Sequence, residues 1–396
     1  MKQTITGIAA LLLGTSPLFA AGIERAPQSL GVLFEEGNYA ELSFGGVDPT
    51  VQGHDNSALT GYPFKTGDVA QGYGFVGLAY KHQFSPNLSA AFIMEQPFGA
   101  DILYPTQPGP APNPAAEGSV LFGGTRATVD STTFTALARY KFENNFSIHG
   151  GIRGSKASGV VALNGPAYSV FSGYKAELDD SWGAGYVIGA AYEIPDIAAR
   201  VSLTYNSSIE HDFDTRETGN AIDPDGPGPA PSMPLLNGES STKVKTPQSI
   251  TLEGQTGIAA DTLLFGSIRW VKWSEFKVDP ANFTKLNGGE GLVDLEDETT
   301  YTIGVGRKFT ENWSGSVSFN YENGGDDLVS PLAPTNGRKG ITVAAIYTQD
   351  NIKITTGINY TKLGDAKPET GTPDVERATM DDNHAWGVGV RIGYSF

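Results

Sequence analysis

The chain has 396 residues, 50 of them glycine, with no cysteine and a formal net charge of −17 at pH 7. The absence of cysteine excludes a disulfide framework and a thiolate metal site. The acidic balance argues against a nucleic-acid partner, because binding to phosphate requires basic patches.

The first twenty residues have the pattern of a secretory signal peptide. Lys2 supplies a positive charge, residues 8–13 form a short apolar core, and small residues around Ala20 suit cleavage at that point. The apolar core is too short to cross a bilayer as a helix, and no run of about 18 apolar residues follows. We therefore expect residues 1–20 to be removed, leaving either an exported soluble protein or a closed membrane barrel.

Residues 21–36 show neither strand alternation nor a helical face. A segment of this kind ahead of a barrel either hangs loose or folds into the lumen as a plug, and the pattern alone leaves both open. Ile23, Leu30 and Phe34 are too apolar for a free tail in water. We therefore expect a short plug at residues 21–36, which also contains Arg25.

From residue 37 onward, apolar residues alternate with small or polar ones, which indicates β-strands. The 14 alternating segments are residues 37–46, 72–84, 88–96, 126–142, 146–163, 181–194, 198–210, 243–255, 262–276, 294–309, 313–323, 340–348, 352–363 and 383–396. The last is the clearest, with Trp386, Val388 and Ile392 on one face and Gly389 and Arg391 on the other. An even number of such segments is typical of bacterial single-chain membrane barrels.

The connections alternate between short turns, such as residues 85–87, and long loops, such as residues 97–125. Outer-membrane barrels show this alternation, whereas a soluble sandwich has no reason for it. Pro- and Gly-rich stretches at residues 107–112 and 224–234 predict loops without a packed core of their own. Residues 37–396 are thus predicted to form an all-β, 14-stranded antiparallel transmembrane β-barrel.

Four short stretches carry a resemblance to a known family: Ala21-Gly22, Pro97-Phe98-Gly99, residues 246–249 (Thr-Pro-Gln-Ser) and residues 270–276 (Trp-Val-Lys-Trp-Ser-Glu-Phe). With its strand count and loop order, the mature chain resembles the FadL family of outer-membrane transporters for long-chain fatty acids and other hydrophobic compounds. The resemblance implies the outer membrane of a Gram-negative bacterium, a plug inside the barrel and a lateral opening in its wall. The chain departs from the family in its short N-terminal segment, which contains no Asn-Pro-Ala element.

The end of the third predicted strand is a candidate for that lateral opening. Pro97 cannot donate a hydrogen bond to the strand ladder, and Gly99 permits a bend. Either Pro97 ends the strand on the loop side, or, as the resemblance implies, it opens the wall. In the second case Phe92, Phe98 and Phe134 are candidate apolar lining.

Several cations fall on predicted lumen faces: Arg139, Arg153, Arg200, Arg307, Lys353 and Arg391. One interpretation pairs them with interior acids such as Glu253 and Glu322. The other places one or two of them against a ligand carboxylate, to which arginine binds in a bidentate manner. Arg153 is then preferred, because it lies mid-strand between His149 and Ser155 on the same face.

These observations favour a passive outer-membrane channel for hydrophobic molecules such as long-chain fatty acids, captured at the extracellular loops. A polar-solute diffusion porin is the alternative. A barrel lipase or protease is disfavoured because no Gly-x-Ser-x-Gly occurs and no Ser, His and Asp cluster is evident.

No cofactor or metal is expected. The Gly-x-Gly-x-x-Gly pattern at residues 72–77 lies inside an alternating segment rather than between a strand and a helix. The five histidines lack ligand spacing, and the acidic pairs at residues 326–327 and 381–382 suit solvated loops better than cation sites. The expected partners are outer-membrane lipid and lipopolysaccharide around a monomer.

Overall fold

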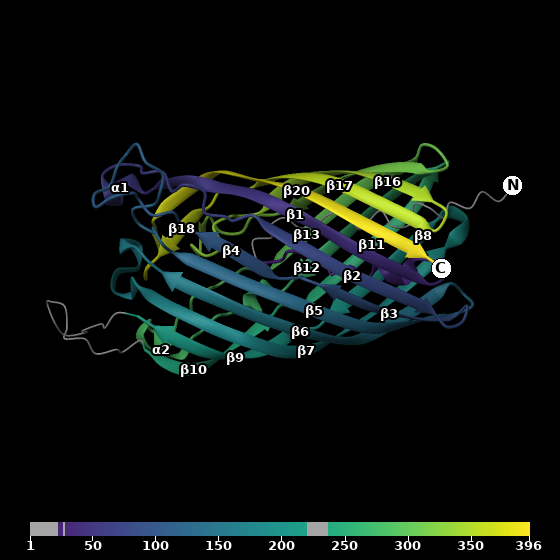
Figure 1. The fold of residues 1–396 in the computed structure, drawn as a ribbon, viewed down its shortest axis with the longest axis horizontal. Coiled ribbons are helices and arrows are strands. Elements are labelled where there is room, and N and C mark those ends of the chain that lie inside the picture. Colours follow the sequence, from purple (N-terminus) through teal and green to yellow (C-terminus); the bar gives the residue numbers. More distant parts are fainter. Residues whose placement is uncertain (1–22, 27, 220–236) are drawn as a thin grey trace.

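The computed structural model describes residues 23–26, 28–219 and 237–396 (Figure 1). The expected signal peptide and the loop stretch at residues 224–234 lie outside the described residues. None of the helices in the described part of the chain has the length and hydrophobicity needed to cross a membrane.

The described residues form a closed antiparallel barrel. Its wall strands are β1 (Tyr39–Asp55), β2 (Tyr73–Gln83), β3 (Leu88–Glu95), β4 (Gly99–Leu103), β5 (Arg126–Lys141), β6 (Phe146–Leu163), β7 (Tyr174–Ile194), β8 (Ala199–Asn206), β9 (Ile209–Thr218), β10 (Gly238–Thr246), β11 (Ser249–Ala259), β12 (Thr262–Val271), β13 (Glu298–Lys308), β14 (Trp313–Glu322), β16 (Arg338–Gln349), β17 (Ile352–Leu363) and β20 (Ala378–Ser395). Closure is made at β1, where Ala40 lies opposite Tyr80 of β2 and opposite Tyr394 of β20.

Three positions in the wall are each shared by two successive strands. β3 and β4 both pair with β5, β8 and β9 both pair with β7, and β11 and β10 pair with β8 and β9. The 17 strands of the sheet, less these three second halves, give 14 wall positions. The prediction of a 14-stranded antiparallel barrel is therefore confirmed.

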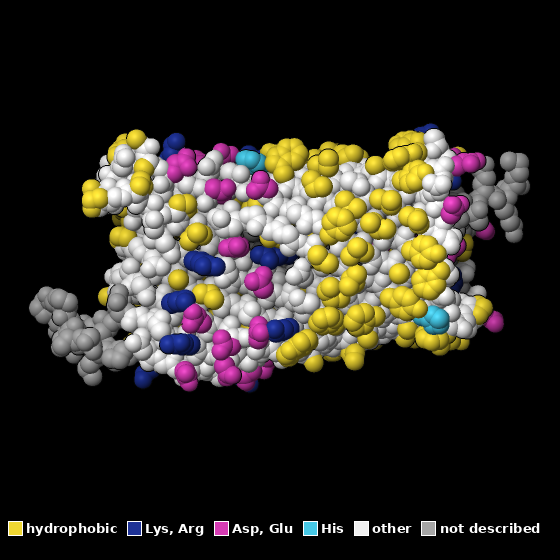
Figure 2. Space-filling view, in the orientation of Figure 1, with side chains coloured by type: hydrophobic (Ala, Val, Ile, Leu, Met, Phe, Trp, Pro, Cys, Tyr) yellow, Lys and Arg dark blue, Asp and Glu magenta, His cyan; other side chains and the backbone are white. Residues whose placement is uncertain are grey.

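Alternation along each strand separates a lipid face from the interior. Trp386 and Val388 of β20 are each 52% exposed, whereas Ala385, which directly precedes Trp386, is fully buried. Figure 2 shows such apolar side chains gathered over the half of the barrel nearer the C-terminus, with charged side chains over the other half. The long loops leave from the charged end, which is the extracellular end in outer-membrane barrels.

Several predicted strand boundaries are corrected. The segment expected at residues 37–46 continues to Asp55, and the one expected at 181–194 begins at Tyr174. These extensions were missed because their outward residues are polar or charged above the lipid. The segments expected at 198–210 and 243–255 are each broken, near Ser207 and near Pro247.

Short elements also lie outside the wall strands. They are η2 (Gly31–Phe34) in the N-terminal segment, and in the loops and turns α1 (Ser57–Thr60), η3 (Pro166–Phe171), η4 (Pro195–Ile197), η5 (Trp273–Glu275), α2 (Ala281–Leu286), β15 (Leu328–Val329), β18 (Lys367–Thr370) and β19 (Val375–Glu376).

The prediction that the long loops lack a packed core is wrong for three of them. Phe122, Trp273, Phe283 and Leu332 come from three different loops and belong to one buried apolar cluster. The Pro-rich stretch at residues 107–112 marks only a mostly exposed loop tip. Isolated apolar residues in separate loops gave no periodic signal, and only the closed barrel brings them together.

Candidate functional site

The loops enclose a cavity of about 1080 Å³ at the extracellular end, which we call the vestibule. Part of its wall is apolar and includes Val170, Phe171, Phe283, Leu292, Leu295 and Leu332. Its charged lining is mostly acidic: Asp279, Glu290, Asp294, Glu296, Asp297, Glu298, Asp326, Glu369 and Asp374, against Lys277 and Arg377. None of these nine carboxylates lies within ion-pair distance of a described Lys, Arg or His. The vestibule therefore joins apolar surface to uncompensated negative charge.

The acidic surroundings of the vestibule affect the pKa of one of its carboxyl groups, Glu369. Burial, together with the negative charges of Asp374 and Glu290, raises the pKa of Glu369 to about 7, although Arg377 acts in the opposite direction. One carboxylate oxygen of Glu369 is buried without a hydrogen-bond partner. Because a raised carboxyl pKa means that the proton is lost only above that value, the negative charge of the vestibule grows as the pH rises through 7.

Below the vestibule, residues 23–26 and 28–36, here called the N-terminal segment, lie inside the barrel. Glu24 pairs with Arg269 of β12, and both side chains are less than a tenth exposed. The Gln28 side chain accepts a hydrogen bond from Arg153 of β6. Glu35 pairs with Lys353 of β17 at 2.7 Å. These contacts reach strands on several sides of the barrel, so the segment lies across the lumen.

The apolar residues of the N-terminal segment pack against the interior of the wall. Leu30, Val32 and Leu33 form a buried cluster with wall residues that include Ile93 and Leu137. Phe34 lies under two guanidinium groups, 4.6 Å from Arg139 and 4.1 Å from Arg200 measured to its ring centre. The role of this segment as a plug stays a prediction.

The third wall strand is interrupted where Pro97 was expected to act. Glu95 at the end of β3 lies opposite Thr133 of β5, whereas Gly99 at the start of β4 lies opposite Asp130. Four steps along the third strand therefore match three steps along β5, so the third strand contains one extra residue. Such a bulge bends a strand and locally disrupts its ladder.

Other groups replace the lost ladder bonds at this bulge. The Ser131 hydroxyl accepts a hydrogen bond from the Phe98 backbone N–H at 3.0 Å and donates one to its carbonyl oxygen at 2.6 Å. The Pro97 carbonyl accepts from the Arg25 N–H at 2.7 Å, and the Gly99 N–H donates to the Ile23 carbonyl at 2.7 Å. The interrupted strand thus pairs inward with the N-terminal segment. A Cβ at Gly99 would lie 2.5 Å from the Arg25 guanidinium, so glycine permits this close approach.

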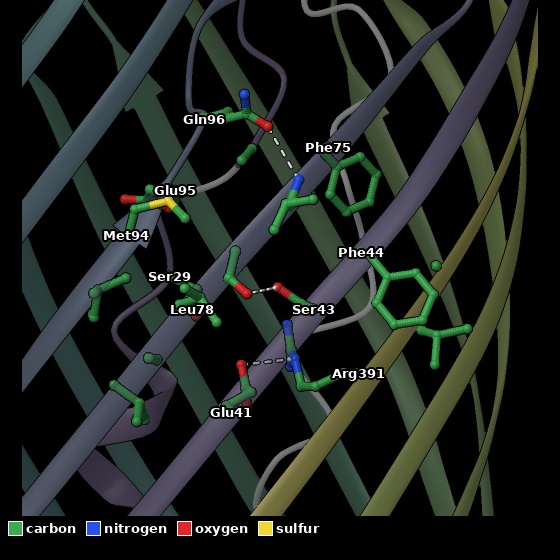
Figure 3. Close-up of a pocket in the computed structure, with 18 of the residues that line it drawn as sticks. Ser29, Glu41, Ser43, Phe44, Phe75, Leu78, Met94, Glu95, Gln96 and Arg391 are labelled. Atoms are coloured by element: carbon green, nitrogen blue, oxygen red, sulfur yellow. Dashed lines mark hydrogen bonds and ion pairs between the residues drawn. The ribbon is translucent and has the colours of Figure 1, made fainter.

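On its other side, the third strand separates from β2. The ladder between β2 and β3 runs from Gln83 to Leu78 and does not include Tyr73–Gly77. The Gln96 side chain accepts a hydrogen bond from the Val76 N–H at 3.1 Å, as a side-chain substitute for a ladder bond (Figure 3).

A cavity of about 130 Å³ lies at this separation, which we call the wall cavity. Its lining includes Ala26 and Ser29 of the N-terminal segment as well as Leu78 and Met94. Leu78 is 47% exposed on the lipid face, whereas Ser29 lies inside the barrel. The wall cavity is therefore lined by residues of both faces of the wall, between β2 and the end of β3.

The structure brings some of the sequence-predicted residues together and separates others. Pro97, Gly99 and the buried Phe98 form the bulge, and Ile23 and Arg25 contact it. Arg153 is buried in the lumen against Gln28. Leu30 and Phe34 pack deeper in the lumen. The ligand contacts of these residues stay predictions.

Phe92 and Phe134 lie apart from that group. They stack on each other at 6.2 Å on the lipid face, and neither lines the wall cavity. Arg307 was expected in the lumen, which is wrong. Arg307 lies on the same outward face as Ile303 and Val305, near the end of β13. At the end of a strand a long charged side chain can extend to the membrane surface.

Sequence reasoning missed Glu24, Arg269, Gln96 and Ser131. The two charges lie 245 positions apart, and no pattern links them. Ser131 and Gln96 are ordinary polar residues in alternating segments. Their role in replacing ladder hydrogen bonds becomes visible only once the extra residue at Pro97 is known. No group of three or more potential metal-ligating side chains occurs among the described residues.

Residues 117–396 match a family model described as outer membrane protein transport protein (OMPP1/FadL/TodX). No curated protein sequence matches the chain. The fold matches a FadL homologue from Pseudomonas aeruginosa with a TM-score of 0.70 at 14% identity, covering 100% of this chain and 98% of that one. It also matches the Pseudomonas putida toluene transporter TodX (0.62, 14%, covering 95% and 97%) and the Ralstonia pickettii toluene transporter TbuX (0.59, 11%, covering 97% and 99%). At such identities these structures show a shared fold.

Proposed function

Because the chain belongs to the OMPP1/FadL/TodX family of outer membrane transport proteins, we propose that it is a passive channel for hydrophobic molecules. The protein is an outer-membrane β-barrel of a Gram-negative bacterium. In our proposal, cargo enters at the vestibule, passes into the lumen and leaves sideways through the wall cavity into the lipid. The transport involves no catalysed reaction.

The wall cavity is the observation that carries this proposal. A hydrophobic solute gains about 0.8 kcal/mol for each CH₂ group kept out of water, so a twelve-carbon chain would lose roughly 10 kcal/mol by emerging into the periplasm. An exit between β2 and β3 avoids that loss, because Ala26 and Ser29 line the wall cavity on the lumen side and Leu78 and Met94 line it on the lipid side. Fatty acids, hydrocarbons and long-chain alcohols would all avoid this loss by the same exit, because each has a large apolar part.

We further propose that the N-terminal segment closes the lumen toward the periplasm. Its ion pairs with Arg269 and Lys353 hold it across the barrel, and Leu30 and Leu33 pack against the inner face of β1, β3, β5 and β7. A closed lower lumen leaves the wall cavity as the outlet for an apolar molecule.

The surroundings of the barrel are part of the same proposal. Large apolar residues are exposed on every wall position, including Phe44, Ile152, Leu252 and Ile303. This continuous belt suits a single copy surrounded by lipid. Above it, exposed charge pairs such as Lys156 with Asp180 at 2.6 Å would face the phosphate groups of lipopolysaccharide.

The test compares an apolar with a polar probe. Cells of a Gram-negative host that lacks its own channel of this family should take up radiolabelled 1-dodecanol severalfold faster when they produce the protein. Proteoliposomes containing it should not swell in arabinose, because the N-terminal segment crosses the lumen. Swelling in arabinose without faster dodecanol uptake would instead show a polar-solute diffusion porin. Heat-modifiability on a gel confirms folded protein in each sample.

A further inference from the structure

We propose that the vestibule excludes anionic amphiphiles, so that the cargo of this channel is uncharged: hydrocarbons and alcohols rather than ionised fatty acids. This inference rests on the proposed function and specifies the class of molecule that passes. It follows from two independent features, the charge at the entrance and the state of the interior cations.

The entrance places negative charge where a ligand head group must pass. Of the eleven charged residues that line the vestibule, nine are acidic, and none of those nine is neutralised by an ion pair with a described residue. Asp374 and Glu290 lie close enough to Glu369 for their negative charges to disfavour its ionisation. A carboxylate entering this space meets the same repulsion, whereas a hydroxyl or hydrocarbon does not.

Five of the interior cations already have a carboxylate partner. In the part of the wall that the structure describes, the buried lumen cations already contact protein groups. The pairs are Arg139 with Glu193, Arg269 with Glu24, Arg338 with Glu322, Arg391 with Glu41, and Lys353 with Glu35. Three others have neutral partners in the N-terminal segment: Arg153 donates to the Gln28 side chain, Lys81 donates to the Glu35 backbone carbonyl, and Arg200 lies over the ring of Phe34.

A ligand carboxylate would therefore have to displace an interior carboxylate or break a contact that holds the N-terminal segment to the wall. Displacing Glu24 or Glu322 would leave a buried carboxylate without its cation, which is strongly unfavourable. An apolar molecule requires no such exchange. The lumen therefore agrees with the vestibule in favouring cargo without a negative charge.

The test uses two probes with the same tail, radiolabelled 1-dodecanol and dodecanoate, in cells at pH 8.5, where the carboxylate is ionised. At low ionic strength we expect dodecanol uptake to exceed dodecanoate uptake on the order of tenfold. This ratio should fall in 300 mM KCl, because salt screens the repulsion between the vestibule and the carboxylate. The triple substitution Asp294→Asn, Glu369→Gln, Asp374→Asn should raise the ratio of dodecanoate uptake to dodecanol uptake severalfold.

A matched control removes the same charge elsewhere. Asp179→Asn, Asp214→Asn and Glu239→Gln neutralise three exposed carboxylates of the outer wall that do not line the vestibule, and should change neither rate. Equal uptake of both probes by the unmodified protein, with no response to the vestibule substitutions, would overturn the charge selection while leaving the channel function intact. Absence of protein-dependent dodecanol uptake would instead overturn the proposed function itself.

Discussion

Deletion of Pro97 is expected to abolish dodecanol uptake in a barrel that still folds. The third strand has four steps between Glu95 and Gly99 where β5 has three between Thr133 and Asp130. Removing one residue makes the two strands equal in length and removes the residue that lacks an N–H donor. The third strand can then run straight and pair with the stretch of β2 at Gly74–Gly77, which otherwise pairs only with β1, and this closes the wall cavity.

Pro97→Ala is the matched control for this deletion. It restores a backbone donor but keeps the extra residue, so the bulge and the uptake rate should persist. Heat-modifiability and surface labelling establish that equal amounts of folded protein are compared. Dodecanol uptake at the unmodified rate after deletion of Pro97 would show that this bulge is not the outlet.

Glu24→Ala is expected to release the N-terminal segment and to produce large conductance steps in planar bilayers. The substitution leaves Arg269, which is 7% exposed, without its carboxylate partner. Breaking a buried ion pair in this way costs about 3–5 kcal/mol, because the remaining charge is not compensated. A loss of this size should undock the segment for a substantial fraction of the time.

Two further variants separate this effect from general damage. Combining Glu24→Ala with Arg269→Met removes both charges and should return the conductance most of the way to that of the unmodified protein. Lys272→Gln breaks the partly exposed pair with Glu275 and should have no effect, since exposed pairs contribute little. Unchanged conductance in Glu24→Ala would mean that the segment does not close the lumen.

The barrel was predictable from sequence because lipid and lumen impose a period of two on every strand. Trp386, Val388 and Ile392 show that period without interruption, and each lies on the lipid face. Where the outward residues become charged above the membrane, as in β9, the signal weakens and the strand ends were misjudged.

The bulge shows why a correct local signal did not give the correct site. Pro97 indicated an irregular strand, but the extra residue also inverts the phase. Before the bulge, even-numbered residues such as Phe92 of β3 face the lipid. After it, odd-numbered residues such as Leu103 of β4 face the lipid, and the even-numbered Phe98 is buried. A set made of Phe92, Phe98 and Phe134 therefore mixes the two faces of the wall.

The partners of the N-terminal segment depend on closure of the whole barrel and could not be inferred locally. Arg153 was selected for its position in mid-strand, and it is indeed buried in the lumen. Its contact with Gln28, however, joins residues 125 positions apart. The balance between interior charges, on which the choice of cargo depends, exists only once all fourteen wall positions are in place.

Reversible closure of the wall tests lateral release most directly. The chain has no cysteine, so Val76→Cys with Gln96→Cys places a unique thiol pair across the separation between β2 and the third strand. A short bifunctional methanethiosulfonate reagent should stop dodecanol uptake, and dithiothreitol should restore it. The same treatment of His82→Cys with Ala90→Cys, in the paired part of β2 and β3, should leave uptake unchanged. Full uptake through a barrel cross-linked between positions 76 and 96 would contradict lateral release at this site.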